Sequence, residues 1–279
     1  MAFDVSPALV LQLKSLGNWR GVLRHRLRNQ INFIRSKSQA RLSGSFRLLK
    51  HHSNAPTDSI TDEFDSQSGH FKEHGWAYIP QFFSTDLHRA ILSAWPDLSH
   101  FTVGANPIKS YDKGPSWSGG DTGEFRQGIH PDFYLGFLAL SSHGFAGRVS
   151  QFCDDGIPRV NSSLGSAWAR TGSLLLPHID DVWRFGQGAV INFVIFVDGS
   201  EPVARSGATA IYSTNTYEKP IFIPPNLRNT ALVYETGRLI YHGFPYVGRG
   251  NFSKRLIAQY SPVGQPKLSA LLTSQRTSK

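Results

Sequence analysis

The second half of the sequence is a series of short β-prone segments with no room for helices between them. From Ser166 onward there are seven such segments, rich in β-branched and aromatic residues and separated by turn residues. So many short strands in under 100 residues indicate a mainly β domain of the jelly-roll or barrel type. The segments span residues 173–176, 189–197, 208–212, 220–223, 230–234, 238–241 and 254–260.

The preceding part of the chain predicts one further strand and flanking helices. Residues 75–80 have the composition of a strand, and Ser84 is a good N-cap for a helix that follows it. Residues 132–152 are predicted to be mainly helical. Residues 103–128 are rich in Gly, Ser, Asp and Pro, so we expect a long loop there, of the kind that often covers an active site.

Basic residues are concentrated at the N-terminus. Residues 1–55 contain ten Lys or Arg and a single acid, Asp4, which accounts for the whole net charge of +9. Apolar residues recur every three or four positions between Trp19 and Ile34, which predicts a basic amphipathic helix. Such an arm can contact an anionic membrane, nucleic acid or a partner, can pack on its own domain, or can act as a targeting peptide.

Composition divides the chain into four regions. We expect a basic arm (1–55), a polar and acidic linker (56–70), a folded domain (71–265) and a C-terminal tail (266–279). Residues 56–279 carry no net charge, and the folded domain shows no base-stacking surface, so we expect a small-molecule or protein substrate and no nucleic acid.

The single cysteine, Cys153, excludes an intrachain disulfide and a zinc site built from several cysteines. This favours a reducing compartment. We find neither a secretory signal nor an apolar run long enough to span a bilayer. We therefore expect a cytoplasmic protein, with peripheral membrane contact or organelle targeting through residues 1–55 left open.

Three residues of the β-rich region form a candidate metal site. His178 and Asp180 are two positions apart, so in a strand they point to the same side. His242 lies 62 residues beyond Asp180, after another β-prone run, and supplies a third ligand. Two imidazoles and one carboxylate leave three of the six positions on Fe(II) open, as in non-haem iron oxygenases, with room for a bidentate cosubstrate and O2.

A residue that could hold the remote carboxylate of such a cosubstrate follows thirteen positions after His242. This is Arg255, whose guanidinium can donate two parallel hydrogen bonds to a carboxylate. Lys254 and Arg249 are rival candidates, because this spacing is longer than usual. We prefer Arg255, which opens the β-prone run that begins at Leu256.

The run from His178 to Tyr260 resembles the core of the prolyl-hydroxylase-like branch of the Fe(II)- and 2-oxoglutarate-dependent oxygenases. The resemblance extends over roughly residues 71–262 and is strongest from His178 onward. The matching pieces, in order, are His178–Asp181, Ile191–Val197, Ser206–Thr209, Tyr241–Gly243 and Arg255.

The resemblance implies a double-stranded β-helix core (jelly-roll, cupin-like) with flanking helices. Fe(II) would be held by His178, Asp180 and His242, and the distal carboxylate of 2-oxoglutarate by Arg255. Asn192 is a further candidate for contact with the cosubstrate. The implied activity is hydroxylation of a C–H bond with O2, releasing succinate and CO2.

Two other functions stay open at this point. One is a cupin-type metal isomerase or dioxygenase that uses no 2-oxoglutarate, and the other is a non-catalytic jelly-roll binding module. A second His-X-Asp pair, His130 and Asp132, is not expected to bind metal. Pro131 between them disfavours a central strand and suits the start of a helix.

Overall fold

The computed structural model describes residues 46–48, 59–106, 109–118, 124–126, 128–180, 189–236, 238 and 240–263. The expected C-terminal tail (266–279) lies outside the described residues. So does the expected N-terminal arm, apart from the short strand β1 (Phe46–Leu48), which pairs with β5.

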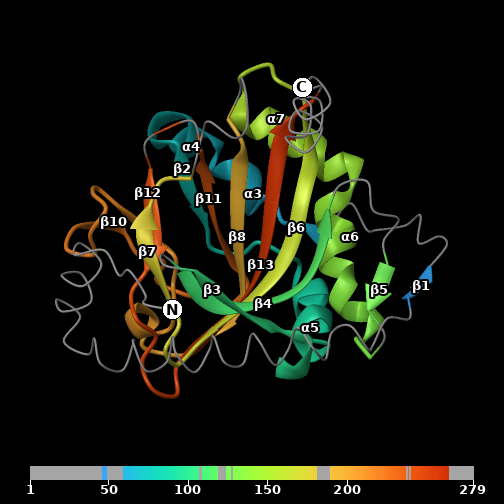
Figure 1. The fold of residues 1–279 in the computed structure, drawn as a ribbon. Coiled ribbons are helices and arrows are strands. Elements are labelled where there is room, and N and C mark those ends of the chain that lie inside the picture. Colours follow the sequence, from blue (N-terminus) through green and yellow to red (C-terminus); the bar gives the residue numbers. More distant parts are fainter. Residues whose placement is uncertain are drawn as a thin grey trace, which may run out of the picture.

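One long, strongly curled antiparallel sheet forms the body of the protein (Figure 1). Its strands are hydrogen-bonded in the order β10-β9-β12-β7-β4-β6-β13-β8-β11-β2, and β3 pairs with β4 at the side of this path. This confirms the expected jelly-roll core. The strands are β2 (Trp76–Ile79), β3 (Thr102–Asn106), β4 (Lys109–Ser118), β5 (Glu124–Arg126), β6 (Arg159–Arg170), β7 (Leu174–His178), β8 (Ile191–Gly199), β9 (Ala210–Tyr212), β10 (Pro220–Phe222), β11 (Thr230–Glu235), β12 (Tyr241–Phe244) and β13 (Phe252–Pro262).

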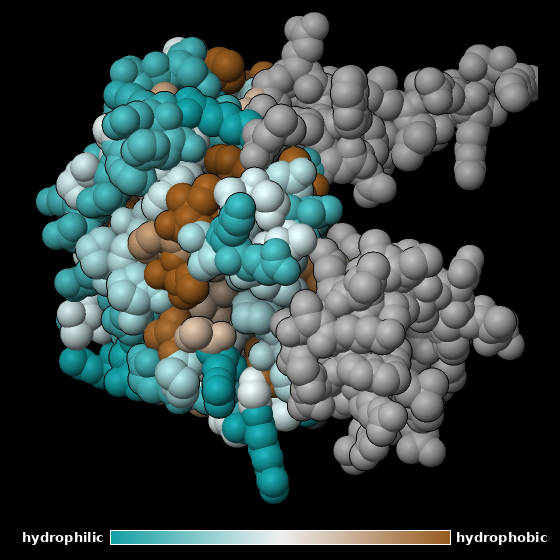
Figure 2. All heavy atoms as spheres, turned by 90° about the vertical axis from the view of Figure 1, so that its left-hand side faces the viewer, coloured by the Kyte–Doolittle hydropathy of each residue, from teal (hydrophilic) through white to brown (hydrophobic). Residues whose placement is uncertain are grey.

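The two edge strands of this sheet, β10 and β2, come together through aromatic side chains. The ring of Phe222 packs 4.8 Å from that of Trp76 and 5.3 Å from that of Tyr78. Its neighbours Ile221 and Ile223 are 57% and 40% exposed. Figure 2 views the side of the molecule that carries β10 and shows hydrophobic residues gathered near its middle. The edge strand therefore has one face in the core and one in solvent.

Helices cover the outer face of the strands β6, β13, β8 and β11. Side chains alternate along β8, so that Ile191, Phe193 and Ile195 pack beneath the helices while Asn192 and Val194 point to the other side. The helices are α3 (Glu63–Ser66), α4 (Ser68–His74), α5 (Thr85–Ser93), α6 (Leu135–Ser141) and α7 (His143–Cys153), with short 3-10 helices at Leu98–His100, Pro131–Tyr134 and Val203–Arg205. None of the helices among the described residues is long and apolar enough to cross a bilayer.

Several expected elements occur where the sequence predicted them. The first strand is β2, and Ser84 caps the following helix by accepting a hydrogen bond from the amide of Leu87 at 3.4 Å. Residues 132–152 are mainly helical, as expected. The strand predicted at 238–241 is displaced toward the C-terminus, since the corresponding strand, β12, begins at Tyr241 and ends at Phe244.

Residues 103–128 were expected to form a loop, and this prediction is wrong for the part of them that the structure describes. This region contains β3, β4 and β5, and β4 lies between β6 and β7 in the middle of the sheet. Gly114 belongs to this Gly-rich stretch but lies within β4, where neighbouring side chains leave no room for a side chain of its own. A Cβ there would lie 2.4 Å from both a ring carbon of Phe101 and the hydroxyl of Ser166.

Residues 59–70, which were expected to be part of a linker, belong to the folded domain, because helix α3 and the first residues of α4 precede Phe71. Ile60 and Phe64 are buried among acidic neighbours, and the ring of Phe64 stacks on Phe152 at 4.4 Å and contacts Phe193 of β8 at 5.8 Å. The polar composition of this segment reflects its exposed face, whereas its two apolar residues fix it to the core.

We predict that Phe64→Ala lowers the free energy of unfolding by about 3–5 kcal/mol, because it opens a cavity in the helix–sheet core. The measurement is urea unfolding followed by circular dichroism. Ile221→Ala, at an exposed site, should change the stability by less than about 1 kcal/mol. Equal effects of the two changes would show that residues 59–70 are not part of the cooperative domain.

Candidate active site

Two histidines face each other across neighbouring strands. His178 ends β7 and His242 lies in β12, and their Cα atoms are direct partners in the antiparallel pairing, with ring centroids 4.4 Å apart. Asp180 follows just beyond the end of β7, with one oxygen 3.5 Å from Nε2 of His178 and the other 3.7 Å from Nε2 of His242. Potential ligand atoms of the three residues all lie within 4.8 Å of one another.

The backbone beside His242 allows this close approach. A Cβ at Gly243 would lie 2.5 Å from the carbonyl oxygen of Leu175, which is backbone and cannot move aside. The pairing of β12 with β7 shifts register immediately after His242. The Tyr217 hydroxyl lies 2.9 Å from the carbonyl oxygen of Leu175 and 3.1 Å from that of Phe244, one on each strand. It thereby ties the two strands together at the irregularity.

Backbone carbonyls orient the two imidazoles. Nδ1 of His178 lies 2.8 Å from the carbonyl oxygen of Leu176, and Nδ1 of His242 lies 3.5 Å from that of Ile240. A carbonyl only accepts hydrogen bonds, so each Nδ1 carries the proton. Each Nε2 is then the ring nitrogen that lies beside Asp180 and is left to bind a metal, as in metal-binding histidines.

Burial sets the charge of these groups. It lowers the pKa of His242 to about 4, against the opposing effect of Asp180, so this imidazole is neutral at pH 7. Burial by itself would raise the pKa of Asp180. Its interactions with His178, His242 and Lys109 outweigh that effect and lower the pKa overall. The site thus offers the neutral imidazole of His242 beside an ionised carboxylate.

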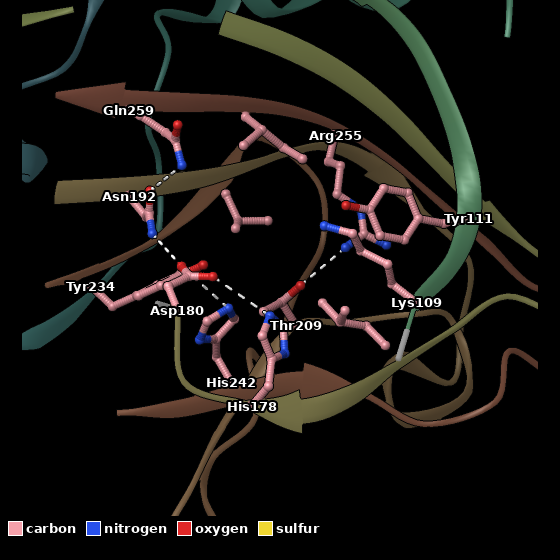
Figure 3. A pocket seen from close by; sticks show the side chains of 13 residues that line it. Lys109, Tyr111, His178, Asp180, Asn192, Thr209, Tyr234, His242, Arg255 and Gln259 are labelled. Carbon is pink, nitrogen blue, oxygen red and sulfur yellow. Dashed lines mark hydrogen bonds and ion pairs between the residues drawn. The ribbon is translucent and has the colours of Figure 1, made fainter. Parts of the chain in front are cut away.

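A cavity of about 130 Å³ extends from these three residues into the barrel (Figure 3). This is roughly ten times the space that a single water molecule needs in such a cavity. Its polar lining residues besides the three are Lys109, Tyr111, Asn192, Thr209, Tyr234, Arg255 and Gln259.

Arg255 is a buried cation in this cavity. It is 2% exposed, and its guanidinium donates to the hydroxyls of Thr209 (3.0 Å) and Ser253 (3.1 Å) and to the carbonyl oxygen of Gly207 (3.1 Å). Its Nε is buried without a hydrogen-bond partner, and no carboxylate within the described ranges pairs with it. Burial lowers its pKa to about 10, so it is charged at pH 7.

The two rival cations lie elsewhere. Lys254 is on the opposite face of β13, with its Nζ 4.9 Å from the ring centre of Trp168, and Arg249 is exposed in the turn before that strand. Neither lines the cavity. Of the three candidates named from the sequence, only Arg255 faces the histidines and Asp180.

Asn192 lines the cavity, but its side chain is bound to Asp180. Its Nδ2 donates to the carboxylate at 2.6 Å, and its Oδ1 accepts from Nε2 of Gln259 at 3.0 Å. Asn192 thus lies in the cavity where the sequence predicted a contact with a cosubstrate, and it also contacts a candidate metal ligand. The pair His130 and Asp132 is exposed at the start of a 3-10 helix, outside the only cluster of potential metal ligands among the described residues.

Five of the polar lining residues were not predicted as site residues from the sequence. Lys109 and Tyr111 lie on β4, where a loop was expected, so nothing indicated their direction. Tyr234 and Gln259 belong to predicted strands, and the two-residue alternation with Leu232 and Ile257 could have placed them inside. Thr209 lies between β8 and β9. The only sequence signal for it was its position in Ser206–Thr209, one of the segments that resemble the oxygenase family.

Comparisons with solved structures identify the fold. A Pseudomonas putida prolyl-4-hydroxylase is 15% identical over 72% of this chain and 100% of its own, with a TM-score of 0.53. The chain has the prolyl-hydroxylase fold. No protein-family model and no curated protein matches the sequence.

The same prolyl-hydroxylase fold occurs in two further neighbours. One is the non-heme alpha-ketoglutarate-dependent epimerase SnoN from nogalamycin biosynthesis, 14% identical over 75% of this chain and 88% of its own, with a TM-score of 0.52. The other is a Trichoplax adhaerens prolyl hydroxylase in complex with a peptide fragment of hypoxia inducible factor, 14% identical over 75% of this chain and 94% of its own, with a TM-score of 0.51.

We predict that the metal-free protein loses about 3 kcal/mol of stability between pH 6.5 and pH 4 through His242 alone. The pKa of His242 is about 4 in the folded protein and near 6.5 in the unfolded chain, so the unfolded state binds the proton first as the pH falls. The measurement is chemical unfolding at a series of pH values in the presence of a chelator. His242→Gln should show a correspondingly weaker pH dependence, and identical slopes would contradict the prediction.

Proposed function

We propose that this chain is an Fe(II)- and 2-oxoglutarate-dependent oxygenase that hydroxylates a C–H bond of a protein side chain or a small metabolite, releasing succinate and CO2. The observation that carries the proposal is the position of Arg255. A buried guanidinium without a carboxylate partner among the described residues shares one cavity with a cluster of two histidines and an aspartate.

The cluster fits iron by the chemistry of its atoms. Two imidazole nitrogens and one carboxylate on a single side are the ligand set of non-haem Fe(II) oxygenases. Because Nδ1 of each ring is bound to a backbone carbonyl, Nε2 is the nitrogen left to coordinate the metal. His178, Asp180 and His242 are therefore our proposed Fe(II) ligands.

The other end of the cavity fits the distal carboxylate of 2-oxoglutarate. A buried charge without a counterion is unfavourable, and an incoming carboxylate would relieve that penalty. The orphaned Nε of Arg255 and the hydroxyl of Thr209, which already accepts from Arg255, lie where such a carboxylate would be received. A cupin-type enzyme without 2-oxoglutarate would leave this cation uncompensated.

Each part of the pocket has a role in the proposed reaction. Fe(II), when bound together with 2-oxoglutarate and O2, supplies the oxidising chemistry that converts the cosubstrate to succinate and CO2 and hydroxylates the substrate. Arg255 orients the cosubstrate by its distal end, and the three ligands orient the opposite end. The apolar walls formed by Leu175, Val194 and Ile257 limit the water around it.

The neighbours support this class of reaction without defining its outcome. Two are prolyl hydroxylases, one of them in complex with a peptide, and a third is an epimerase. One fold thus carries different reactions, since function depends on the site rather than on the architecture. Hydroxylation of a protein or small-molecule substrate is our proposal for this chain.

We expect the anaerobic protein to form a weak visible charge-transfer band when Fe(II) and 2-oxoglutarate are added together. Arg255→Met should weaken 2-oxoglutarate binding by at least about 30-fold, because it removes one partner of a buried charge pair. Lys254→Met, at the neighbouring position on the opposite face of β13, is the matched control and should titrate like the wild type. A band that survives unchanged in Arg255→Met would refute the anchor, whereas iron binding without any band would favour a cupin-type enzyme.

Succinate formation from 2-oxoglutarate should require Fe(II) and O2 and should be abolished by His178→Ala, because one of three proposed ligands is lost. Product analysis by mass spectrometry measures it, with no need to know the prime substrate. Turnover that persisted in His178→Ala would mean that the proposed ligands are wrong.

A further inference from the structure

We propose that Asn192 and Gln259 form a hydrogen-bonded relay that positions Asp180 as a metal ligand. The inference rests on the proposed function, since it concerns one of the three proposed Fe(II) ligands. It assigns to Asn192 a positioning role in place of the direct contact with cosubstrate expected from the sequence.

The relay follows a row of cross-strand neighbours inside the barrel. Asn192 of β8 pairs on one side with Tyr234 of β11 and on the other with Gln259 of β13. Because residues directly opposite each other in antiparallel strands point to the same face, all three side chains enter the cavity at one level. Figure 3 shows Gln259, Asn192 and Asp180 joined in sequence.

The directions of the two hydrogen bonds that form the relay are determined. The carboxylate of Asp180 only accepts, so Asn192 presents its Nδ2 to it, at 2.6 Å. The Oδ1 of Asn192 must then face the other way, where it needs a donor. Gln259 supplies that donor with its Nε2 at 3.0 Å. Neither amide can be reversed without setting two donors or two acceptors against each other.

The two residues beside Asn192 are held in place by other contacts. The backbone carbonyl oxygen of Gln259 accepts a hydrogen bond from the Ser162 hydroxyl at 3.2 Å, across the β13–β6 pairing. On the other side of Asn192, the ring of Tyr234 packs against that of His242, with centroids 4.3 Å apart. The same row of strands therefore contacts two of the three proposed ligands, one by a hydrogen bond and one by ring packing.

This arrangement suits a carboxylate that must bind a metal in a single orientation. Asp180 stands beyond the end of β7, where no regular backbone pairing holds it. Asn192 donates one hydrogen bond from a neutral amide to a carboxylate oxygen of Asp180. This fixes the side chain of Asp180 and leaves its negative charge available. A lysine or arginine in the same place would fix it equally well but would repel the cation.

The test is titration of the metal-free protein with Co(II), which reports binding and ligand geometry through its visible absorption. We expect Asn192→Leu, which keeps the shape and removes the donor, to weaken Co(II) binding by about 10-fold or more and to alter the Co(II) spectrum. Gln259→Met should give a smaller loss in the same direction, because Asp180 keeps its donor but the amide is no longer held. Asn226→Leu, the same substitution in an exposed turn, should bind like the wild type.

The outcomes separate this inference from the proposed function. If the wild type binds Co(II), His178→Ala does not, and Asn192→Leu matches the wild type in affinity and spectrum, the relay is wrong and the ligands stand. If the wild type binds no Co(II), the proposed function fails and the relay fails with it. A purely structural role would lower the melting temperature of metal-free Asn192→Leu but leave the Co(II) spectrum of the folded protein unchanged. Should that variant not fold, Gln259→Met decides the question by the same two readouts.

Discussion

The antiparallel pairing of β7 with β12 is the constraint on which the site depends. It sets His242 directly opposite His178, and a slip of one residue would turn one imidazole to the other face of the sheet. The register is maintained by close backbone contact at Gly243, where any side chain would collide with Leu175. Asp180 completes the cluster from just beyond the end of β7, where Asn192 holds its carboxylate. The positions of the two imidazoles are thus set by backbone pairing, whereas the orientation of Asp180 depends on side-chain contacts.

A second constraint is the buried charge of Arg255. Two hydroxyls and a carbonyl accept hydrogen bonds from this guanidinium, and its central carbon lies 4.5 Å from the ring centre of Phe244. Among the described residues, no acidic side chain pairs with it. Neutral hydrogen-bond partners reduce the penalty of burial without removing it. Stability is therefore given up at the place where a ligand carboxylate would restore it, as is common for binding sites whose polar groups are arranged before the ligand arrives.

The sequence predicted the parts of the fold that local pattern encodes. The period-two strands from residue 173 onward and the helix after Ser84 are visible in composition, as is the cluster of His178, Asp180 and His242 in spacing. Strand β4 was missed because its Gly114 and Pro115 have turn composition, and only packing against Phe101 and Ser166 makes them part of a strand. The segment around Phe64 was missed because its composition is dominated by exposed acidic residues, although a single buried ring is enough to attach it to the core. The link between Asn192 and Asp180 depends on tertiary geometry that no spacing reports.

The position of β13 has a consequence for how the chain reaches its native state. This strand supplies Arg255 and Gln259 and lies between β6 and β8, yet it is the last strand of the described chain. During synthesis, β6 and β8 emerge well before the strand that joins them, and each presents an unpaired edge until then. A nascent chain that already contains both histidines still has a divided sheet and an open barrel. Closure of the barrel must therefore wait for β13, and a chain truncated before this strand would keep two unpaired sheet edges and would be prone to aggregation.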